Sequence, residues 1–183
     1  MSKSLYIPGL GGKRSILLQR TYIGVLNVFR RKNNHISFFD PHWETEEPYA
    51  TKFERLRLHY QQAETPQTVW AVSAGASLAV RLCVELDSQP KLNIVCGKVL
   101  GSEKIGENYR RRAPAFVESV ESSEILYNDL DPDMTTCYIP KDDADGVIET
   151  VDMTVPGSRI VDLPALRHAR AIGYALLRYL PSS

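Results

Sequence analysis

The stretch TVWAVSAGASLAVRL, residues 68–82, places a serine between an apolar run and an apolar helical pattern. The β-branched and aromatic residues before Ser73 predict a buried strand, and the spacing of the apolar residues after it predicts a helix. The serine is flanked by small residues: Ala71, Ala74, Gly75 and Ala76. Ser73 is therefore either a nucleophile on a sharp strand-to-helix turn or a serine that caps the helix.

The order of the other elements predicts the architecture. Short runs rich in Ile, Val, Phe or Tyr alternate with helical patterns along the chain. The predicted strands are Leu5–Ile7, Ile36–Asp40, Val69–Val72, Leu92–Cys96, Thr136–Ile139 and Arg159–Val161. This alternation predicts an α/β fold, a three-layer α/β/α sandwich with about six mostly parallel strands. Ligands of such sheets bind outside the carboxyl ends of the strands, so the residues after each strand are the candidates for a site.

Helical periodicity fills most of the segments between the strands. The predicted helices lie around residues 16–29, 53–60, 78–86 and 168–180. The segment 102–133 is the least regular, and we expect a helix within it at 113–126. The basic run Tyr109–Arg112 is expected to be a solvated helix face. A chain of 183 residues is long enough to bury a substantial core, and we expect one domain, residues 1–183.

The composition argues against several classes of partner. Lys plus Arg and Asp plus Glu both number 22, so no overall charge points to nucleic acid or to a membrane surface. No apolar stretch approaches the roughly 18 to 20 residues that span a bilayer, and the first residues leave no room for a secretory signal. Three cysteines in apolar surroundings favour reduced core thiols over a disulfide or a metal site. The expected location is the cytoplasm, and the oligomeric state is unknown from the sequence.

The glycine-rich stretch YIPGLGGKRS, residues 6–15, follows the first predicted strand. A P-loop would need glycine and Ser or Thr where Ile7 and Arg14 stand, and Arg14 also replaces the third glycine of a dinucleotide-binding turn. The glycines instead allow the backbone N–H of Leu10 to point into a cleft, where it can stabilise an oxyanion. A plain tight turn is the simpler interpretation of the same residues.

A nucleophile at Ser73 needs small neighbours, because strand and helix approach each other closely at such a turn. Ala71, Gly75 and Ala76 meet this demand. The backbone N–H of Ala74 opens the predicted helix, where the positive end of the helix dipole favours negative charge. The N–H of Ala74 is therefore the candidate for a second oxyanion donor.

The two motifs resemble those of the α/β-hydrolase superfamily, specifically its small, lidless serine hydrolases or esterases. The turn PGLGG, residues 8–12, is similar to the oxyanion turn of that superfamily, with Pro8 where a histidine is often found. The stretch AVSAGA, residues 71–76, is similar to its G-x-S-x-G elbow, with Ala71 in place of the first glycine. The resemblance covers nearly the whole chain and implies a minimal α/β-hydrolase fold.

The resemblance also implies a general base and an acid, in the chain order serine, acid, histidine. His168 is the only histidine after Ser73, and it lies between the last predicted strand and the last predicted helix. The acid is expected after the preceding strand, where the residues DGVI resemble the superfamily's Asp-x-Val-Val pattern and favour Asp145. Asp143 and then Asp142 are the alternative acids.

These features predict a carboxylesterase-like serine hydrolase that acts on a small ester, thioester or amide through an acyl-enzyme. The expected partner is a small-molecule acyl substrate, and the expected chemistry uses no cofactor and no metal. Pro8, Ala71 and Arg167, which replaces a glycine often found before the histidine, favour an alternative, a weak or inactive hydrolase fold with a binding or regulatory role. A flavodoxin-like or nucleotide-binding domain shares the alternation of strands and helices but lacks a convincing phosphate loop here.

Overall fold

The computed structural model describes residues 3–30 and 34–180. Its centre is a six-stranded sheet whose neighbouring strands all pair in parallel, in the order β2-β1-β3-β4-β5-β6. The strands are β1 (Ser4–Ile7), β2 (Ile36–Phe38), β3 (Thr68–Val72), β4 (Lys91–Val95), β5 (Thr135–Pro140) and β6 (Arg159–Leu163). All six predicted strands are present, with their ends displaced by no more than two residues.

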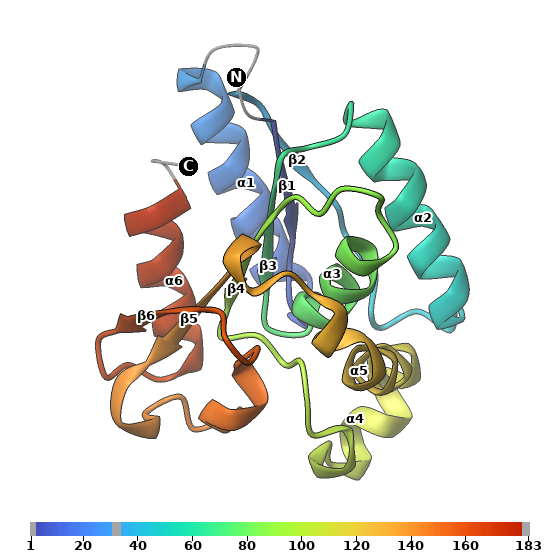
Figure 1. The fold of residues 1–183 in the computed structure, drawn as a ribbon, viewed down its shortest axis with the longest axis vertical. Helices are drawn as coiled ribbons and strands as arrows, with labels where there is room; N and C mark the ends of the chain where they lie inside the picture. The colour runs from blue at the N-terminus through green and yellow to red at the C-terminus, as the bar shows by residue number, and fades with distance from the viewer. Residues whose placement is uncertain (1–2, 31–33, 181–183) are drawn as a thin grey trace.

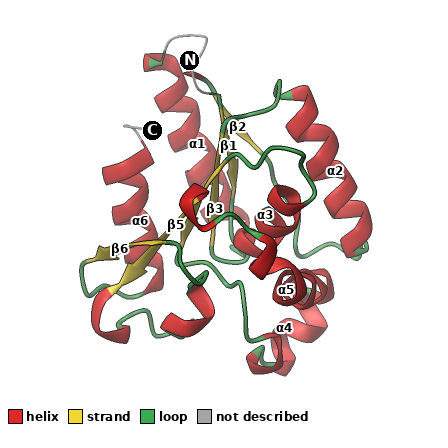
Figure 2. Ribbon diagram, viewed as in Figure 1, coloured by secondary structure: helices red, strands yellow, loops and turns green. Residues whose placement is uncertain are grey.

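Helices cover both faces of this sheet. They are α1 (Lys13–Phe29), α2 (Tyr49–Gln62), α3 (Gly75–Val84), α4 (Glu107–Arg112), α5 (Pro114–Leu126) and α6 (His168–Tyr179). Helices α1 and α6 lie on one face of the sheet, and α2, α3 and α5 lie on the other (Figure 1, Figure 2). The predicted three-layer α/β/α sandwich with parallel strands is confirmed.

The central strands are apolar because helices exclude water from both of their faces. Every residue of β1 and β3 is buried, whereas the edge strands β2 and β6 are partly exposed. The chain order reverses between the adjacent strands β1 and β3, and such a switch point is where open α/β sheets bind ligands. The chain leaves β1 into the glycine turn and leaves β3 at Ser73, so both motifs lie at this point.

Two predicted elements end two residues earlier than their apolar pattern suggests. The second strand ends at Phe38 and not at Asp40, because the Asp40 carboxylate accepts the N–H of His42 and a proline intervenes. The helix expected at 78–86 ends at Val84, just before a turn-forming run that ends in Pro90.

The segment 102–133 contains α4 and α5, which meet at Ala113. Helix α5 is the helix expected at 113–126, and it begins with a proline, which suits the first turn of a helix. The basic run ends α4. Arg111 and Arg112 are exposed there, as expected of a solvated face, but Arg110 is half-buried.

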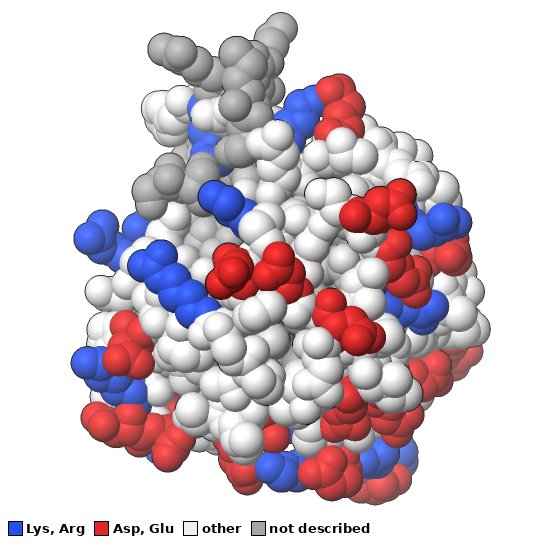
Figure 3. Space-filling model, viewed as in Figure 1, with Lys and Arg blue, Asp and Glu red and all other residues white. Residues whose placement is uncertain are grey.

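Cys83, Cys96 and Cys137 are buried free thiols, as the sequence predicts. Within the described residues, no helix is both long enough and apolar enough to cross a membrane. Charges of both signs are scattered over the face of the molecule that Figure 3 shows.

Candidate active site

Ser73 occupies the sharp turn between β3 and α3. Its φ angle is +49°, in the left-handed region that side chains other than glycine rarely adopt. The turn is fixed by backbone hydrogen bonds, since the N–H of Ser73 donates to Val95 O at 3.0 Å and its carbonyl accepts the N–H of Lys98 at 3.1 Å. No side chain caps α3, whose N-cap residue is Ala74. The helix-capping interpretation of Ser73 is therefore wrong, and the hydroxyl is left for another partner.

The glycines around this turn are required by close packing. A Cβ added to Gly9 would lie 2.6 Å from the Cβ of Ser73, and one added to Gly75 would lie 2.6 Å from the carbonyl oxygen of Ile7. Neither distance is tolerable for a side chain. Ala71 is fully buried, so the alanine fits in the place of the elbow's first glycine.

His168 begins α6 and faces Ser73. Its Nε2 lies 3.0 Å from the Oγ of Ser73, and its Nδ1 lies 2.8 Å from Oδ2 of Asp145. Because an ionised carboxylate only accepts hydrogen bonds, the proton of the neutral imidazole belongs on Nδ1, and Nε2 is free to accept the serine hydroxyl. The backbone supports the arrangement, since the N–H of His168 donates to Asp145 O at 3.0 Å. Ser73, His168 and Asp145 thus form one continuous hydrogen-bonded chain.

The Asp145 carboxylate is almost fully buried, and hydrogen bonds compensate for its burial. Its Oδ1 accepts the backbone N–H groups of Val147 at 3.1 Å and Ile148 at 2.8 Å. Burial raises the pKa of this carboxyl, but the hydrogen bonds from His168 and the two N–H groups outweigh burial and lower the pKa overall. Asp145 is therefore ionised at neutral pH and can stabilise a positive charge on His168.

The two alternative acids lie elsewhere in the same loop. Asp142 and Asp143 are exposed, and the carboxylate of Asp143 accepts the hydroxyl of Thr150. Neither forms a hydrogen bond to His168 within the described structure, whereas Asp145 contacts it through both oxygens.

Cys96 lies beside this chain, after β4. Its thiol and ligand atoms of Asp145 and His168 all lie within 4.8 Å of one another, so the three could offer a metal ion ligands. Burial raises the pKa of the Cys96 thiol, and the charge of Asp145 raises it further. A metal would need the thiolate and would take His168 Nδ1 from Asp145, so metal binding and the hydrogen-bonded chain exclude each other.

The two expected oxyanion donors lie at the same place. Leu10 and Ala74 both line the pocket above Ser73. Within residues 3–30 and 34–180, the backbone N–H of neither residue has a hydrogen-bond acceptor. Two N–H groups without a partner, one of them at the start of a helix, form a ready site for negative charge.

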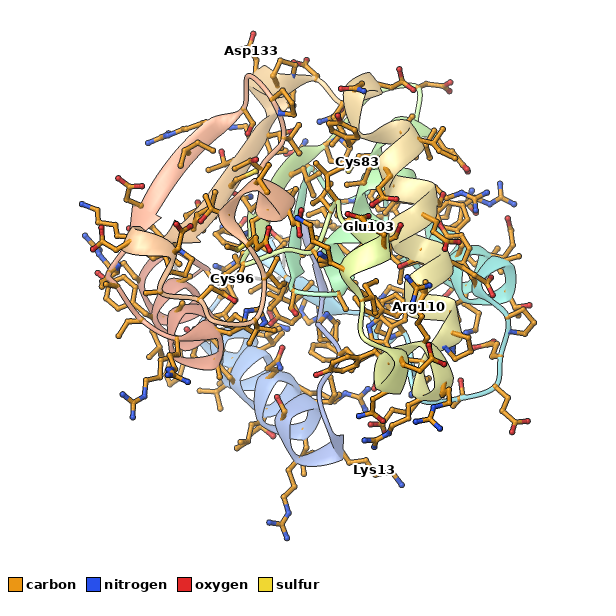
Figure 4. All side chains as sticks on the ribbon, turned by 90° about the horizontal axis from the view of Figure 1, so that it is seen from below. Lys13, Cys83, Cys96, Glu103, Arg110 and Asp133 are labelled. Carbon is orange, nitrogen blue, oxygen red and sulfur yellow. The ribbon has the colours of Figure 1, made fainter. Side chains whose placement is uncertain are left out.

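The pocket above Ser73 has a volume of about 370 Å³. His168 lies on its floor with Ser73, and Ile105, Tyr109 and Phe116 give it an apolar side. These three residues belong to the irregular segment 102–133, which therefore does shape the pocket. Figure 4 looks onto this side of the molecule, with Lys13 at the start of α1, Cys96 after β4 and Arg110 on α4.

Sequence reasoning missed the charged residues of the pocket. The pocket is also lined by Lys98, Lys104, Glu149 and Asp152, which form a connected network of ion pairs. Lys98 is the one signal of this network in the sequence. It interrupts an apolar run directly after β4, the position where such sheets carry functional groups.

A second, more open hollow of about 690 Å³ lies on the other side of the glycine turn. Gly9 and Gly11 line it, together with His42 and Trp43. Trp43 is buried and packs its ring edge-on against Phe116, a residue of the first pocket. The glycine turn therefore separates two hollows, and Ser73 and His168 line the first of them.

No family model and no curated protein matches the sequence. Several solved structures do match the fold. One is the crystal structure of MGS-MChE2, an alpha/beta hydrolase enzyme from the metagenome of sediments from the lagoon of Mar Chica, Morocco. The two structures match with a TM-score of 0.57 and 16% sequence identity, over 99% of this chain and 86% of the other. The present chain therefore has the fold of an α/β hydrolase.

Proposed function

We propose that this protein is a serine hydrolase that cleaves a small ester, thioester or amide. The observation that carries the proposal is the unbroken hydrogen-bonded chain from Ser73 through His168 to the buried Asp145, on the floor of a pocket. A helix-capping serine or a surface histidine would have no reason to lie in such a chain.

In the first half-reaction, Oγ of Ser73 attacks the substrate carbonyl carbon while its proton passes to Nε2 of His168. The carbonyl oxygen becomes an oxyanion, held by the N–H groups of Leu10 and Ala74. When the tetrahedral intermediate collapses, the bond to the leaving group breaks, and His168 returns the proton to the departing alcohol, thiol or amine.

In the second half-reaction, water attacks the acyl-enzyme by the same route. His168 takes a proton from the water and returns it to Oγ of Ser73 as the acid product leaves. Asp145 keeps the imidazole in the required tautomer and stabilises the imidazolium in both steps. No step uses a metal or a cofactor.

The pocket limits the acyl part of the substrate to a small group. Its volume of about 370 Å³ lies at the lower end of the range for small-molecule sites. A carboxylesterase-like activity on short acyl chains fits this size better than the hydrolysis of long-chain lipids.

The test is covalent labelling of the purified protein by a fluorophosphonate, which phosphonylates an activated serine with loss of fluoride. We expect labelling of the wild type and none of Ser73→Ala or His168→Ala. Ser88→Ala, a matched change of an exposed serine in the loop before β4, should label like the wild type. Labelling that survives in Ser73→Ala would contradict the proposal, and folded wild-type protein without labelling would favour the binding or regulatory alternative.

A further inference from the structure

The wall of the pocket beside Ser73 holds a charge arrangement that the proposed acyl transfer does not need. Nζ of Lys98 donates to Oδ2 of Asp152 at 2.7 Å, and Nζ of Lys104 lies 3.2 Å from the other oxygen of the same carboxylate. The side chains of Lys98 and Asp152 are only 9% and 5% exposed. Two ammonium groups therefore share one buried carboxylate, and this part of the wall carries one positive charge in excess.

The charge that balances this excess lies at the surface. Oε2 of Glu149 is 2.7 Å from Nζ of Lys104, but the glutamate side chain is 67% exposed. Such exposed pairs contribute little stability, because water and salt screen them. Another carboxylate can therefore replace Glu149 on Lys104 at little cost, while the buried pair of Lys98 and Asp152 stays intact.

The segment that carries Lys104 is held in place by a further cation. The guanidinium of Arg110 donates to the carbonyl oxygens of Ser102 at 2.6 Å and Ile105 at 3.0 Å, on either side of Lys104. This fixes the backbone at the rim of the pocket and adds positive charge there. Residues 102–112 carry four basic side chains against two acidic ones, so this segment as a whole is positively charged.

We infer that the pocket binds a substrate whose acyl part carries a carboxylate, which Lys104 binds in place of Glu149 while Ser73 attacks the carbonyl at the other end. The acyl part stays bonded to Ser73 through both half-reactions, so the pocket that contains Ser73 must hold it. The apolar side formed by Ile105 and Phe116 suits the methylene groups between the two ends. The inference rests on the proposed hydrolase function and names its substrate class, the monoesters of short dicarboxylic acids.

The test compares three esters of similar size. p-Nitrophenyl hexanoate is neutral, mono-p-nitrophenyl adipate carries a carboxylate at the end of its acyl chain, and 4-carboxyphenyl hexanoate carries it on the leaving group. The quantity of interest is the kcat/KM of each charged ester divided by that of the neutral ester. We expect the wild type to prefer the adipate, and we expect added salt to weaken that preference.

Two variants change the charge of the site in opposite directions. Lys104→Met should lower the kcat/KM for the adipate ester, relative to that for the neutral ester, by about tenfold, because a charge-assisted hydrogen bond is lost. Glu149→Gln should raise it by roughly threefold, because the competing carboxylate is gone. Lys91→Met changes the exposed lysine that begins β4, makes the same change in net charge as Lys104→Met and should leave the ratio unchanged. A ratio that is the same in all four proteins would overturn the inference, as would a response confined to 4-carboxyphenyl hexanoate.

A binding measurement separates this inference from the hydrolase proposal. Monomethyl adipate should bind the Ser73→Ala protein, as seen by ligand-observed NMR, more weakly after Lys104→Met and more tightly after Glu149→Gln. If the neutral ester is hydrolysed through Ser73 while binding is the same in every variant, the hydrolase stands and the carboxylate site is wrong. If no ester is hydrolysed but binding follows this pattern, the carboxylate site stands and the hydrolase proposal is wrong.

Discussion

The backbone of Ser73 is held in a conformation that costs energy. At φ +49° a residue with a Cβ is destabilised by about 1 kcal/mol relative to glycine, and the hydrogen bonds of the turn hold Ser73 in this conformation. We expect Ser73→Gly to unfold at a higher denaturant concentration than Ser73→Ala, which keeps the Cβ, although neither variant has a nucleophile. Urea unfolding of the two proteins measures the difference, and equal midpoints would show that the turn is not strained.

In the proposed mechanism, Asp145 acts on the reaction through His168. Asp145→Asn should preserve the fold but lower kcat by about a thousandfold or more, since an amide cannot stabilise the imidazolium and favours the wrong tautomer. Steady-state hydrolysis of an activated ester measures this. Asp143→Asn, a matched change two residues away in the same loop, should have a small effect. Equal losses in the two variants would argue against Asp145 as the acid.

The lowered pKa of Asp145 also links its charge to stability. Since its pKa lies below the usual value in the folded protein, the ionised group stabilises the fold above about pH 4, and this contribution is lost as the pH falls through the lowered pKa. The free energy of unfolding of the wild type should therefore fall more steeply between pH 5 and pH 3 than that of Asp145→Asn. Parallel pH profiles in chemical denaturation would contradict this.

At the scale of single residues, the sequence pointed to the hydrogen-bonded chain but not to the charged wall. Ser73 and His168 each lie between a predicted strand and a predicted helix, a position that the sequence pattern alone indicates. The choice of Asp145 came from the residues that follow it, and the structure adds the reason, because their N–H groups donate to its carboxylate. Lys104 and Asp152 are far apart in the chain, and only the folded structure brings them together.

At the scale of elements, the glycine turn is matched in shape to the elbow. Gly9→Ala would place a Cβ 2.6 Å from that of Ser73, so one backbone must move, and small displacements of a nucleophile are costly. We expect ester hydrolysis to fall at least about a hundredfold. Gly12→Ala is the control, because a Cβ there meets nothing within 4 Å, and its activity should stay close to that of the wild type. Full activity in Gly9→Ala would contradict the packing.

Strands and helices were predictable where apolar residues recur with a single period along the element. The central strands are buried on both faces and form short apolar runs in the sequence. The long helices have one apolar face, so both kinds of element could be placed closely. Helix α4 was predicted only through the basic run at its end, because it is six residues long and has no buried residue. Its position depends on what it packs against, which a sequence pattern does not contain.

At the scale of the whole molecule, the ion pair of Lys98 and Asp152 joins two loops. The N–H of Lys98 binds the carbonyl of Ser73, and Asp152 lies in the loop that carries Asp145, so the pair ties the turn of Ser73 to the loop of Asp145. Asp152→Asn would leave the buried ammonium of Lys98 without its main partner and should cost about 3 kcal/mol.

The double variant Lys98→Met with Asp152→Leu provides the comparison. A well-packed apolar pair often replaces a buried ion pair at little cost, so the double variant should be more stable than Asp152→Asn alone. Thermal unfolding of the three proteins measures this. If the double variant is less stable than Asp152→Asn, the attraction within the ion pair itself holds the loops together, and not only the neutralisation of a buried charge.

The segment 102–112 supplies Lys104, Ile105 and Tyr109 to the pocket, whereas Ser73, His168 and Asp145 belong to other parts of the chain. If the proposed roles hold, reactivity and selectivity therefore reside in different parts of the chain. We expect substitutions within residues 102–112 to change which acid is selected, while the residues that break the ester bond stay in place.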